Sequence, residues 1–334
     1  MKILILGGTR FMGSFLAEQL LKRGDDLTLV HRGQTQVHAF DGARHVLLDR
    51  ADGHAAIPRE SWDVVVDVSG YVPGQVYDAV RHLEASAARY VFVSSISAYA
   101  DVAQPGVTES APLAQLSAQA ADEALADVRS PRSMQTYGED KALSERVVLD
   151  TVGAARSTIV RPGMIVGPRD PTGRFSYWVR RSGEGGEILA PAPADQPVQA
   201  IDARDLAAFI VRLIDAEQSG VFNATWPAQP RTFADLVGAE ATWVDPHWLI
   251  DRGVEPWGSL PFWLGPDPAA AGMLEVDIRK ALGAGLAGRD LEQTIADTRA
   301  WLAESGAPDA DSTLTRARER ELLAEWHSRP AARS

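Results

Sequence analysis

The chain has 334 residues and a mass of 36.0 kDa, with 45% hydrophobic and 23% charged residues, enough for one large α/β domain or two modest ones. A net charge of −12 argues against a nucleic-acid partner, and the absence of cysteine excludes disulfides, thiolate nucleophiles and cysteine zinc sites. No apolar run is long enough for a membrane span, and residues 1–6 run into two glycines without a cleavage pattern. We therefore expect a cytoplasmic protein with no membrane partner.

Short runs of Val, Ile and Leu alternate with amphipathic stretches through the first half of the chain. They predict helices at residues 12–23 and 76–87, and strands at residues 2–6, 27–31, 45–48, 63–68, 90–94 and 157–160. Strands that are hydrophobic without interruption are buried on both faces. Because helices separate these strands, the pattern predicts a parallel sheet built from βαβ units.

The second half of the chain predicts smaller elements. Residues 101–136 form a polar excursion, and residues 168–197 are interrupted by Gly, Pro and Arg. Beyond them we predict a strand at 220–224 and helices at 203–216, 291–304 and 312–326. The chain contains no internal repeat.

A glycine-rich turn follows the first predicted strand and opens the first helix, with the sequence GGTRFMG. Glycine permits a sharp turn, a close approach of the backbone to a diphosphate and tight packing of helix on sheet, and the helix N-terminus then faces the phosphates. We predict that this loop binds a dinucleotide, although Arg10 stands where the usual pattern has its central glycine; a tight turn without a ligand is the alternative. The predicted contacts are Gly7, Gly8, Thr9, Arg10, Phe11, Met12 and Gly13.

The end of the second predicted strand bears on the choice of dinucleotide. Proteins that select NAD usually place a carboxylate there for the adenosine ribose, but this chain has His31 and Arg32. Two guanidinium groups, Arg32 and Arg10, suit the 2′-phosphate of NADP better than a free hydroxyl, with NAD as the alternative. A second alternative is that Arg32 is a solvated turn residue without a ligand. Asp49 and Arg50, after the third strand, are predicted to meet the adenine edge.

Tyr137 and Lys141 are four residues apart in a stretch whose apolar spacing predicts a helix, so both side chains project from one face. The chain has six tyrosines and only four lysines, which makes a chance pairing at this spacing rare. A phenol with a pKa of about 10 is a poor base at neutral pH, but a nearby ammonium should stabilise the phenolate and lower that pKa. We predict that Tyr137 is a general acid/base tuned by Lys141.

A serine-rich turn that contains Ser95 ends the fifth predicted strand, where open parallel sheets bind their ligands. The chain resembles the extended short-chain dehydrogenase/reductase superfamily in several motifs. These are the glycine loop, this serine turn, Tyr137 with Lys141, and the later sequences RPG at 161–163 and GP at 167–168. The resemblance is to the NAD-dependent epimerase/dehydratase branch, in the atypical group with a GGTRF loop. Specific motifs carry it over about residues 1–225.

The resemblance implies an α/β fold, a Rossmann-type doubly wound parallel sheet with a smaller carboxy-terminal substrate-binding region. Residues 1–167 would form the dinucleotide-binding domain and 168–334 mainly the substrate-binding region, with 198–225 returning to the Rossmann core and 328–334 a frayed tail. Ser95 would polarise the substrate oxygen, Tyr137 exchange its proton and Lys141 hold the nicotinamide ribose. Further cofactor contacts would come from Val68, Ser69, Gly70, Pro162 and Met164.

The resemblance is incomplete in the proton relay. The family often adds an Asn before the serine strand, but the only Asn here is Asn223, so we expect a relay through Tyr71, Gln75 or water. No metal site is expected, because the seven histidines lack ligand spacing. Side chains predicted to face the substrate, with a solvated loop as the alternative, are Ser97, Arg174, Trp178 and Gln199.

We therefore expect an NAD(P)-dependent oxidoreductase with a Ser-Tyr-Lys site. It would reduce, oxidise or epimerise a secondary alcohol carbon of a small hydroxylated substrate related to a sugar, a nucleoside or a nucleotide-sugar. A homodimer is left open. The alternative is a catalytically inactive NAD(P)-binding or RNA-binding protein resembling the chloroplast stem-loop RNA-binding relatives that share the GGTRF loop, but the acidic charge and the complete serine, tyrosine and lysine set argue against it.

Overall fold

A seven-stranded parallel sheet organises the first two thirds of the protein. The computed structural model describes residues 1–329 except 36–39, 130–133, 239 and 309. The strand order is β11-β6-β5-β4-β1-β2-β3, every neighbouring pair is parallel, and the order reverses between β1 and β4. This confirms the predicted doubly wound fold. The strands are β1 (Lys2–Leu6), β2 (Asp26–His31), β3 (Arg44–Leu47), β4 (Trp62–Asp67), β5 (Ala87–Val93), β6 (Ser157–Pro162) and β11 (Gly220–Ala224).

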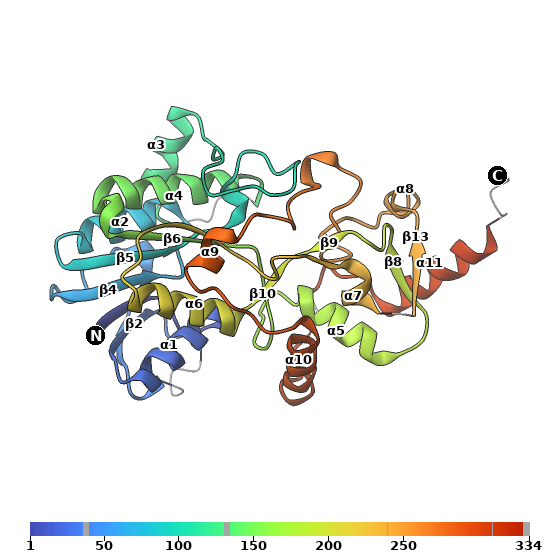
Figure 1. Cartoon of the computed structure of the whole chain (residues 1–334), viewed down its shortest axis with the longest axis horizontal. Coiled ribbons are helices and arrows are strands. Elements are labelled where there is room, and N and C mark those ends of the chain that lie inside the picture. The colour runs from blue at the N-terminus through green and yellow to red at the C-terminus, as the bar shows by residue number, and fades with distance from the viewer. Residues whose placement is uncertain (36–39, 130–133, 239, 309, 330–334) are drawn as a thin grey trace.

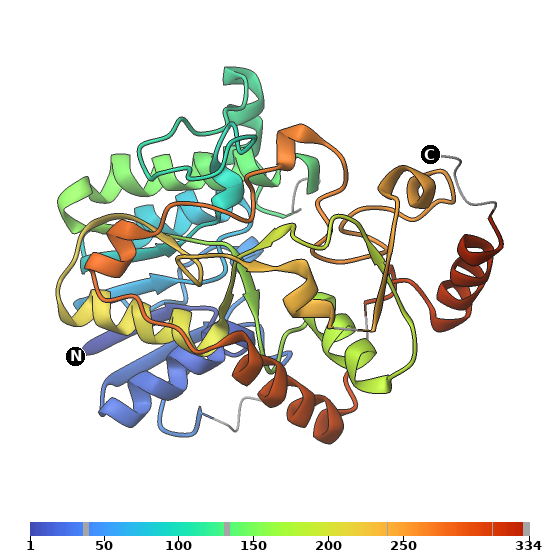
Figure 2. The same ribbon diagram turned by 45° about the vertical axis from the view of Figure 1, so that its right-hand side comes forward.

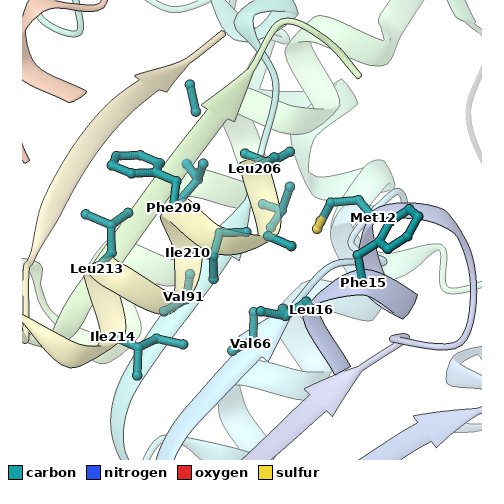
Figure 3. Packing of buried hydrophobic residues seen from close by; sticks show 14 of the residues in the cluster. Met12, Phe15, Leu16, Val66, Val91, Leu206, Phe209, Ile210, Leu213 and Ile214 are labelled. Atoms are coloured by element: carbon teal, nitrogen blue, oxygen red, sulfur yellow. The ribbon is translucent and has the colours of Figure 1, made fainter. Parts of the chain in front are cut away.

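Helices cover both faces of this sheet (Figure 1). One face carries α1 (Phe11–Arg23) and α6 (Ala203–Asp215), and the other carries α2 (Pro73–Leu83) and α4 (Tyr137–Val152), with α3 (Ala118–Ala126) packed on α2. Figure 3 shows the contact between α1 and α6 above β4 and β5. Burying each Leu, Ile or Phe there contributes about 1.5–3 kcal/mol. The labelled side chains are Met12, Phe15, Leu16, Val66, Val91, Leu206, Phe209, Ile210, Leu213 and Ile214.

A second, smaller lobe begins where β6 leaves the sheet, and it lies to the right of the sheet in Figure 1 and Figure 2. Three two-stranded pairings build it: β7 (Met164–Val166) with β10 (Ala200–Asp202), β8 (Ile188–Pro191) with β13 (Ala241–Val244), and β9 (Pro197–Val198) with β12 (Arg231–Thr232). Its aromatic core includes Trp178, Phe233 and Trp263. The helices of this lobe are α5 (Arg174–Glu184), α7 (Phe233–Val237), α8 (Pro246–Ile250), α10 (Leu291–Ser305) and α11 (Arg316–Ser328), whereas α9 (Arg279–Gly283) packs on β11 of the sheet.

Two predicted helices have wrong boundaries. The helix predicted at 76–87 begins at Pro73, which suits the first turn because it needs no N–H donor, and ends at Leu83 because β5 already begins at Ala87. The helix predicted from residue 312 begins at Arg316, capped by Thr315. Of the predicted tail 328–334, residue 328 ends α11, and 330–334 lie outside the described residues.

Candidate active site

The glycine loop joins β1 to α1 with the backbone geometry that glycine permits. Gly7 and Gly8 have φ of 100° and 92°, and a Cβ on Gly13 would lie 2.9 Å from the Cα of Gly8, so the helix packs directly on the turn. The first turn of α1 has no acidic residue, and its N-cap, Arg10, makes no side-chain capping bond. The free N–H groups and the helix dipole therefore favour an anion here, which fits the diphosphate of a dinucleotide.

A cavity of about 590 Å³ opens beside this helix start. Thr9, Arg10 and Phe11 line one side, and residues 169–173 of the second lobe line the other. Asp170 is 4% exposed, and its Oδ2 has no hydrogen-bond partner among the described residues. A dinucleotide over the glycine loop would thus contact both lobes.

The His31 imidazole is buried and has both nitrogens bonded within the protein. The N–H of Gly33 donates to its Nδ1 over 3.0 Å, and its Nε2 lies 2.8 Å from Nδ1 of His45, whose Nε2 lies 3.1 Å from the carbonyl of Phe40. This chain of bonds holds when both imidazoles are neutral, and burial, followed by the charge of His45, lowers the pKa of His31 accordingly. The predicted contact of the His31 side chain with the cofactor is therefore wrong.

Arg50 is also committed to the interior. Its guanidinium donates to both carboxylate oxygens of Asp67 over 2.8 Å and to the hydroxyl of Ser69 over 3.0 Å, and Arg50 is 8% exposed. Burial alone would raise the pKa of the Asp67 carboxyl, but the Arg50 guanidinium outweighs burial and lowers it. Arg50 thus braces the exit of β4, and its predicted contact with adenine is wrong.

Other groups remain available at this end of the cleft. The exposed Asp49 uses its carboxylate to accept the N–H of Ala51. Arg32 and Arg10 are exposed, and neither forms an ion pair with a described residue. These two guanidinium groups are the free cations that the sequence places here.

The serine turn and the tyrosine helix are in direct contact. Ser95 caps a 3-10 turn at Ile96–Ala98 by accepting the N–H of Ser97 over 3.1 Å, which leaves its own hydroxyl proton free to be donated. A Cβ on Gly138 would lie 2.2 Å from the carbonyl oxygen of Ser97, so only glycine fits beside Tyr137. The Ser95 hydroxyl is within hydrogen-bonding reach of Tyr137.

The electrostatics of Tyr137 and Lys141 differ from the prediction. Burial and, to a smaller extent, Tyr71 raise the pKa of Tyr137, and the hydrogen bond with Ser95 and the charge of Arg174 lower it; the net result is a rise to about 12. Burial lowers the pKa of Lys141 to about 8. Burial thus favours the neutral form of both groups, and the charge of Lys141 is not among the causes that lower the pKa of Tyr137. The expected lowering of the pKa of Tyr137 by Lys141 is wrong in the protein without a ligand.

Lys141 braces two strand exits. It is 4% exposed, and its Nζ donates to the carbonyls of Gly70 over 2.9 Å and Val93 over 3.0 Å. An ammonium has three N–H donors, so one remains for another partner. A Cβ on Gly70 would lie 2.4 Å from the Phe92 ring, which fixes glycine at that exit.

The four predicted substrate residues divide into two groups. Trp178 is wholly buried and donates its indole N–H to Pro261 over 2.6 Å. Gln199 is 2% exposed, and its amide bonds backbone groups at both ends. Both belong to the packing of the second lobe, so these two predictions are wrong. Arg174 and Ser97 are half-buried, and Arg174 acts on Tyr137 through its charge.

The remaining predicted cofactor residues lie at or just beyond the ends of strands near the glycine loop and α4. Val68 lies against the glycine loop, since a Cβ on Gly7 would lie 2.8 Å from its Cγ2. Ser69 donates its hydroxyl to the carbonyl of Leu6 over 3.0 Å. Pro162 ends β6, and Met164 begins β7 and is partly exposed.

A buried polar cluster that was not predicted lies behind the serine turn. Glu145 accepts the Ser94 hydroxyl and forms a 2.6 Å ion pair with Arg161, and both members of the pair are at most 3% exposed. The Tyr99 hydroxyl donates to Asn223 over 2.6 Å. The sequence spacing could have predicted that Glu145 is buried, because Glu145 follows Lys141 by one helical turn and so lies on the same face of the helix.

Within the described part of the chain, no group of three or more acidic or histidine side chains is placed to hold a metal ion. A search of the same residues finds no helix with the length and apolarity needed to cross a bilayer.

Known proteins were compared with this chain at the level of family, sequence and structure. The sequence model of the NAD dependent epimerase/dehydratase family matches residues 3–225. A curated relative, the chloroplast stem-loop binding protein of 41 kDa b from Arabidopsis thaliana, is 26% identical in an alignment of 243 residues that covers 66% of this chain and 58% of that protein. The chain therefore spans less than two thirds of the length of this relative.

Solved structures share the fold over nearly the whole chain. The Bordetella bronchiseptica enzyme WbmH in complex with NAD⁺ is 18% identical, with a TM-score of 0.65, over 91% of this chain and 99% of that one. UDP-glucuronic acid 4-epimerase from Bacillus cereus in complex with NAD is 14% identical, with a TM-score of 0.66, over 94% of this chain and 100% of that one. At such identities the likeness shows a common fold.

Proposed function

The chain belongs to the NAD dependent epimerase/dehydratase family, and from this premise we propose that it moves hydride between a nicotinamide dinucleotide and a secondary alcohol carbon of a polyhydroxylated substrate. The observation that carries the proposal is the meeting of Ser95, Tyr137 and Lys141 at the carboxyl ends of β4 and β5. The glycine loop opens at the same edge of the sheet.

In this proposal each side chain has a separate role. Ser95 donates its free hydroxyl proton to the substrate oxygen, and Tyr137 takes the alcohol proton during oxidation or returns it during reduction. The remaining N–H of Lys141 is the donor available to the nicotinamide ribose. Arg174 supplies the fixed positive charge that favours an anionic oxygen at Tyr137. The dinucleotide, when bound, supplies the group that accepts or gives the hydride.

We propose NADP as the preferred dinucleotide, with NAD as the alternative. Arg32 and Arg10 are exposed without carboxylate partners among the described residues, and charge-assisted hydrogen bonds to a 2′-phosphate would satisfy both. The corrected orientation of His31 strengthens the case for these two arginines, because that imidazole has no free nitrogen for a ribose hydroxyl.

For the substrate we propose a nucleotide-sugar or a related sugar. Two observations support it: the UDP-sugar named for one structural neighbour, and the polar groups that the second lobe brings toward the site. Arg174 offers a cation for a phosphate, and the free oxygen of Asp170 accepts from a hydroxyl. Met164 and Ser97 would border the same space.

The experiment is a panel of nucleotide-sugars incubated with the protein, with and without added NADPH, followed at the nicotinamide absorbance band. Product formed without net change of cofactor would exclude a reductase, and one-to-one loss of NADPH would exclude an epimerase. Absence of dinucleotide binding together with absence of product contradicts the proposal.

A second candidate function is binding of structured RNA, which the chloroplast stem-loop binding relative supports. The net charge of −12 opposes it, because RNA affinity depends on neutralising phosphates. Retention on heparin and a salt-dependent shift of a stem-loop RNA would favour this candidate. We expect neither.

A further inference from the structure

The ammonium group of Lys141 is enclosed by aromatic rings as well as by two carbonyls. Its Nζ lies 5.0 Å from the ring centre of Tyr71, 5.1 Å from that of Phe92 and 5.9 Å from that of Tyr137. With 4% of the residue exposed, water reaches this amine poorly. Any proton that Lys141 gains or loses must therefore pass through a neighbouring group.

Of these three rings, Tyr71 alone combines a hydroxyl with wide exposure. It follows Gly70, whose carbonyl holds Lys141, and it is 57% exposed, whereas Phe92 is wholly buried and has no hydroxyl. Tyr137 is half-buried and faces Ser95. Tyr71 thus has one side at the buried amine and another in solvent.

The Tyr71 phenol interacts electrostatically with groups on two other elements. It interacts with Tyr137 on the catalytic helix and with Arg10 of the glycine loop. Tyr71 therefore lies between the part of the cleft that would bind the diphosphate and the part that holds the catalytic phenol.

The other polar side chains near Lys141 have fixed partners. The Gln75 amide donates to the carbonyl of Val128 over 2.7 Å, which removes the second relay candidate that the sequence suggested. Asp67 is bonded to Arg50, and Ser69 donates to Leu6. The described residues thus leave Tyr71 as the side chain that can carry a proton outward from Lys141.

We propose that Tyr71 is a proton-relay residue that connects the buried amine of Lys141 to solvent. The Tyr71 oxygen takes a proton from Nζ, directly or through one water, and gives its own hydroxyl proton to bulk water, so the phenol is regenerated and one proton leaves the site. Uptake follows the reverse path. The role in turnover rests on the proposed function, because net oxidation of an alcohol releases one proton and net reduction consumes one.

The direct test needs no substrate. The chain has four lysines, so a spectrum of ¹⁵N-lysine-labelled protein contains four side-chain signals, and the exchange of the Lys141 Nζ protons with water can be followed below the pKa of that amine. Tyr71→Phe keeps the ring beside Nζ and removes only the hydroxyl. We expect exchange at Lys141 to slow by about tenfold or more. Unchanged or faster exchange would overturn the relay.

Two further variants distinguish proton transfer by the Tyr71 hydroxyl from shielding of Lys141 against water by the Tyr71 ring. Tyr77→Phe removes the hydroxyl of another exposed tyrosine, on α2, and should leave exchange at Lys141 unchanged; an equal slowing there would contradict the assignment. Tyr71→Ala removes the ring, admits water to Nζ and should restore fast exchange. Slow exchange in Tyr71→Ala would show that the phenol is not the path.

Turnover gives a second readout once the panel has supplied a substrate. Tyr71→Phe should lower turnover by about tenfold, and small imidazole or amine buffers should restore it while leaving the wild type unaffected. A variant at wild-type rate, or a slow variant that buffers do not rescue, would contradict the proposal. Failure of the wild type on the whole panel would count against the proposed function alone, since the exchange experiment still decides the role of Tyr71.

Discussion

The two ends of the cleft use charge in opposite ways. At the end that holds the proposed catalytic residues, burial dominates: the pKa values of Tyr137 and Lys141 are both shifted in favour of the neutral forms. At the adenosine end, Arg32 and Arg10 remain exposed and charged. Substitutions at the buried end should therefore have large effects that depend on pH, and those at the exposed end smaller effects that depend on salt.

The largest effect is expected at the catalytic phenol. Tyr137→Phe removes the proton that the substrate oxygen must exchange, and should lower turnover by about 10²–10⁴ with little change in dinucleotide affinity. Steady-state rates and a dinucleotide titration on the same preparation check both halves. Tyr77→Phe is the matched control, and near-normal turnover of Tyr137→Phe would contradict the assigned role.

Arg50 tests whether burial, and not position along the cleft, determines the size of the effect. It was predicted to contact adenine, but it is buried, as Lys141 is. Asp67→Asn leaves the Arg50 guanidinium buried without its counter-charge and should lower the free energy of unfolding by about 3–5 kcal/mol. Denaturant titration measures it. Glu18→Gln, at the exposed ion pair with Arg169, is the control and should change stability much less; equal effects would mean that burial does not distinguish the two pairs.

The buried amine should also make stability depend on pH. The pKa of Lys141 falls from 10.5 to about 8 on folding, so between these values the unfolded chain binds more protons than the folded protein, and stability from this group rises with pH. Lys141→Met should remove that rise. The unfolding free energies of both proteins are measured from pH 8 to pH 10, and the difference between their slopes gives the contribution of Lys141. Parallel curves would show that folding does not lower the pKa of Lys141. Above pH 10 the raised pKa of Tyr137 acts in the opposite sense.

The smallest effect is expected at the exposed end. Arg32→Ala should weaken NADP binding by about 1.5–3 kcal/mol and leave NAD almost untouched, because only NADP carries the 2′-phosphate. Titrations of both dinucleotides at two salt concentrations measure the difference and its screening. If the wild-type protein binds NADP and NAD with equal affinity, Arg32 does not contribute to dinucleotide selection.

The sheet and the placement of the site were predictable because local patterns encode them. Uninterrupted hydrophobic runs predicted six of the seven strands, five in the first half of the chain and one at 157–160. The strand predicted at 220–224 is the seventh. The glycine loop and the helix bearing Tyr137 and Lys141 were likewise visible in spacing alone.

The failures share a physical cause, since each depended on a partner distant in sequence. Arg50 is oriented by Asp67, and Trp178 by a carbonyl at Pro261. His31 is fixed by His45, on the neighbouring strand. The electrostatics of Tyr137 and Lys141 were reversed because desolvation depends on the whole fold, whereas spacing reports only that the two groups are adjacent.

The most direct test of hydride transfer with Tyr137 as the acid/base is a single-turnover experiment. Oxidised dinucleotide, enzyme and nucleotide-sugars are mixed at comparable concentrations, and the absorbance of reduced nicotinamide is followed in wild type and in Tyr137→Phe. The account predicts that the band appears in the wild type and forms about 10²-fold or more slowly in the variant. Equal rates in the two proteins, or no band with any member of the panel, would contradict it.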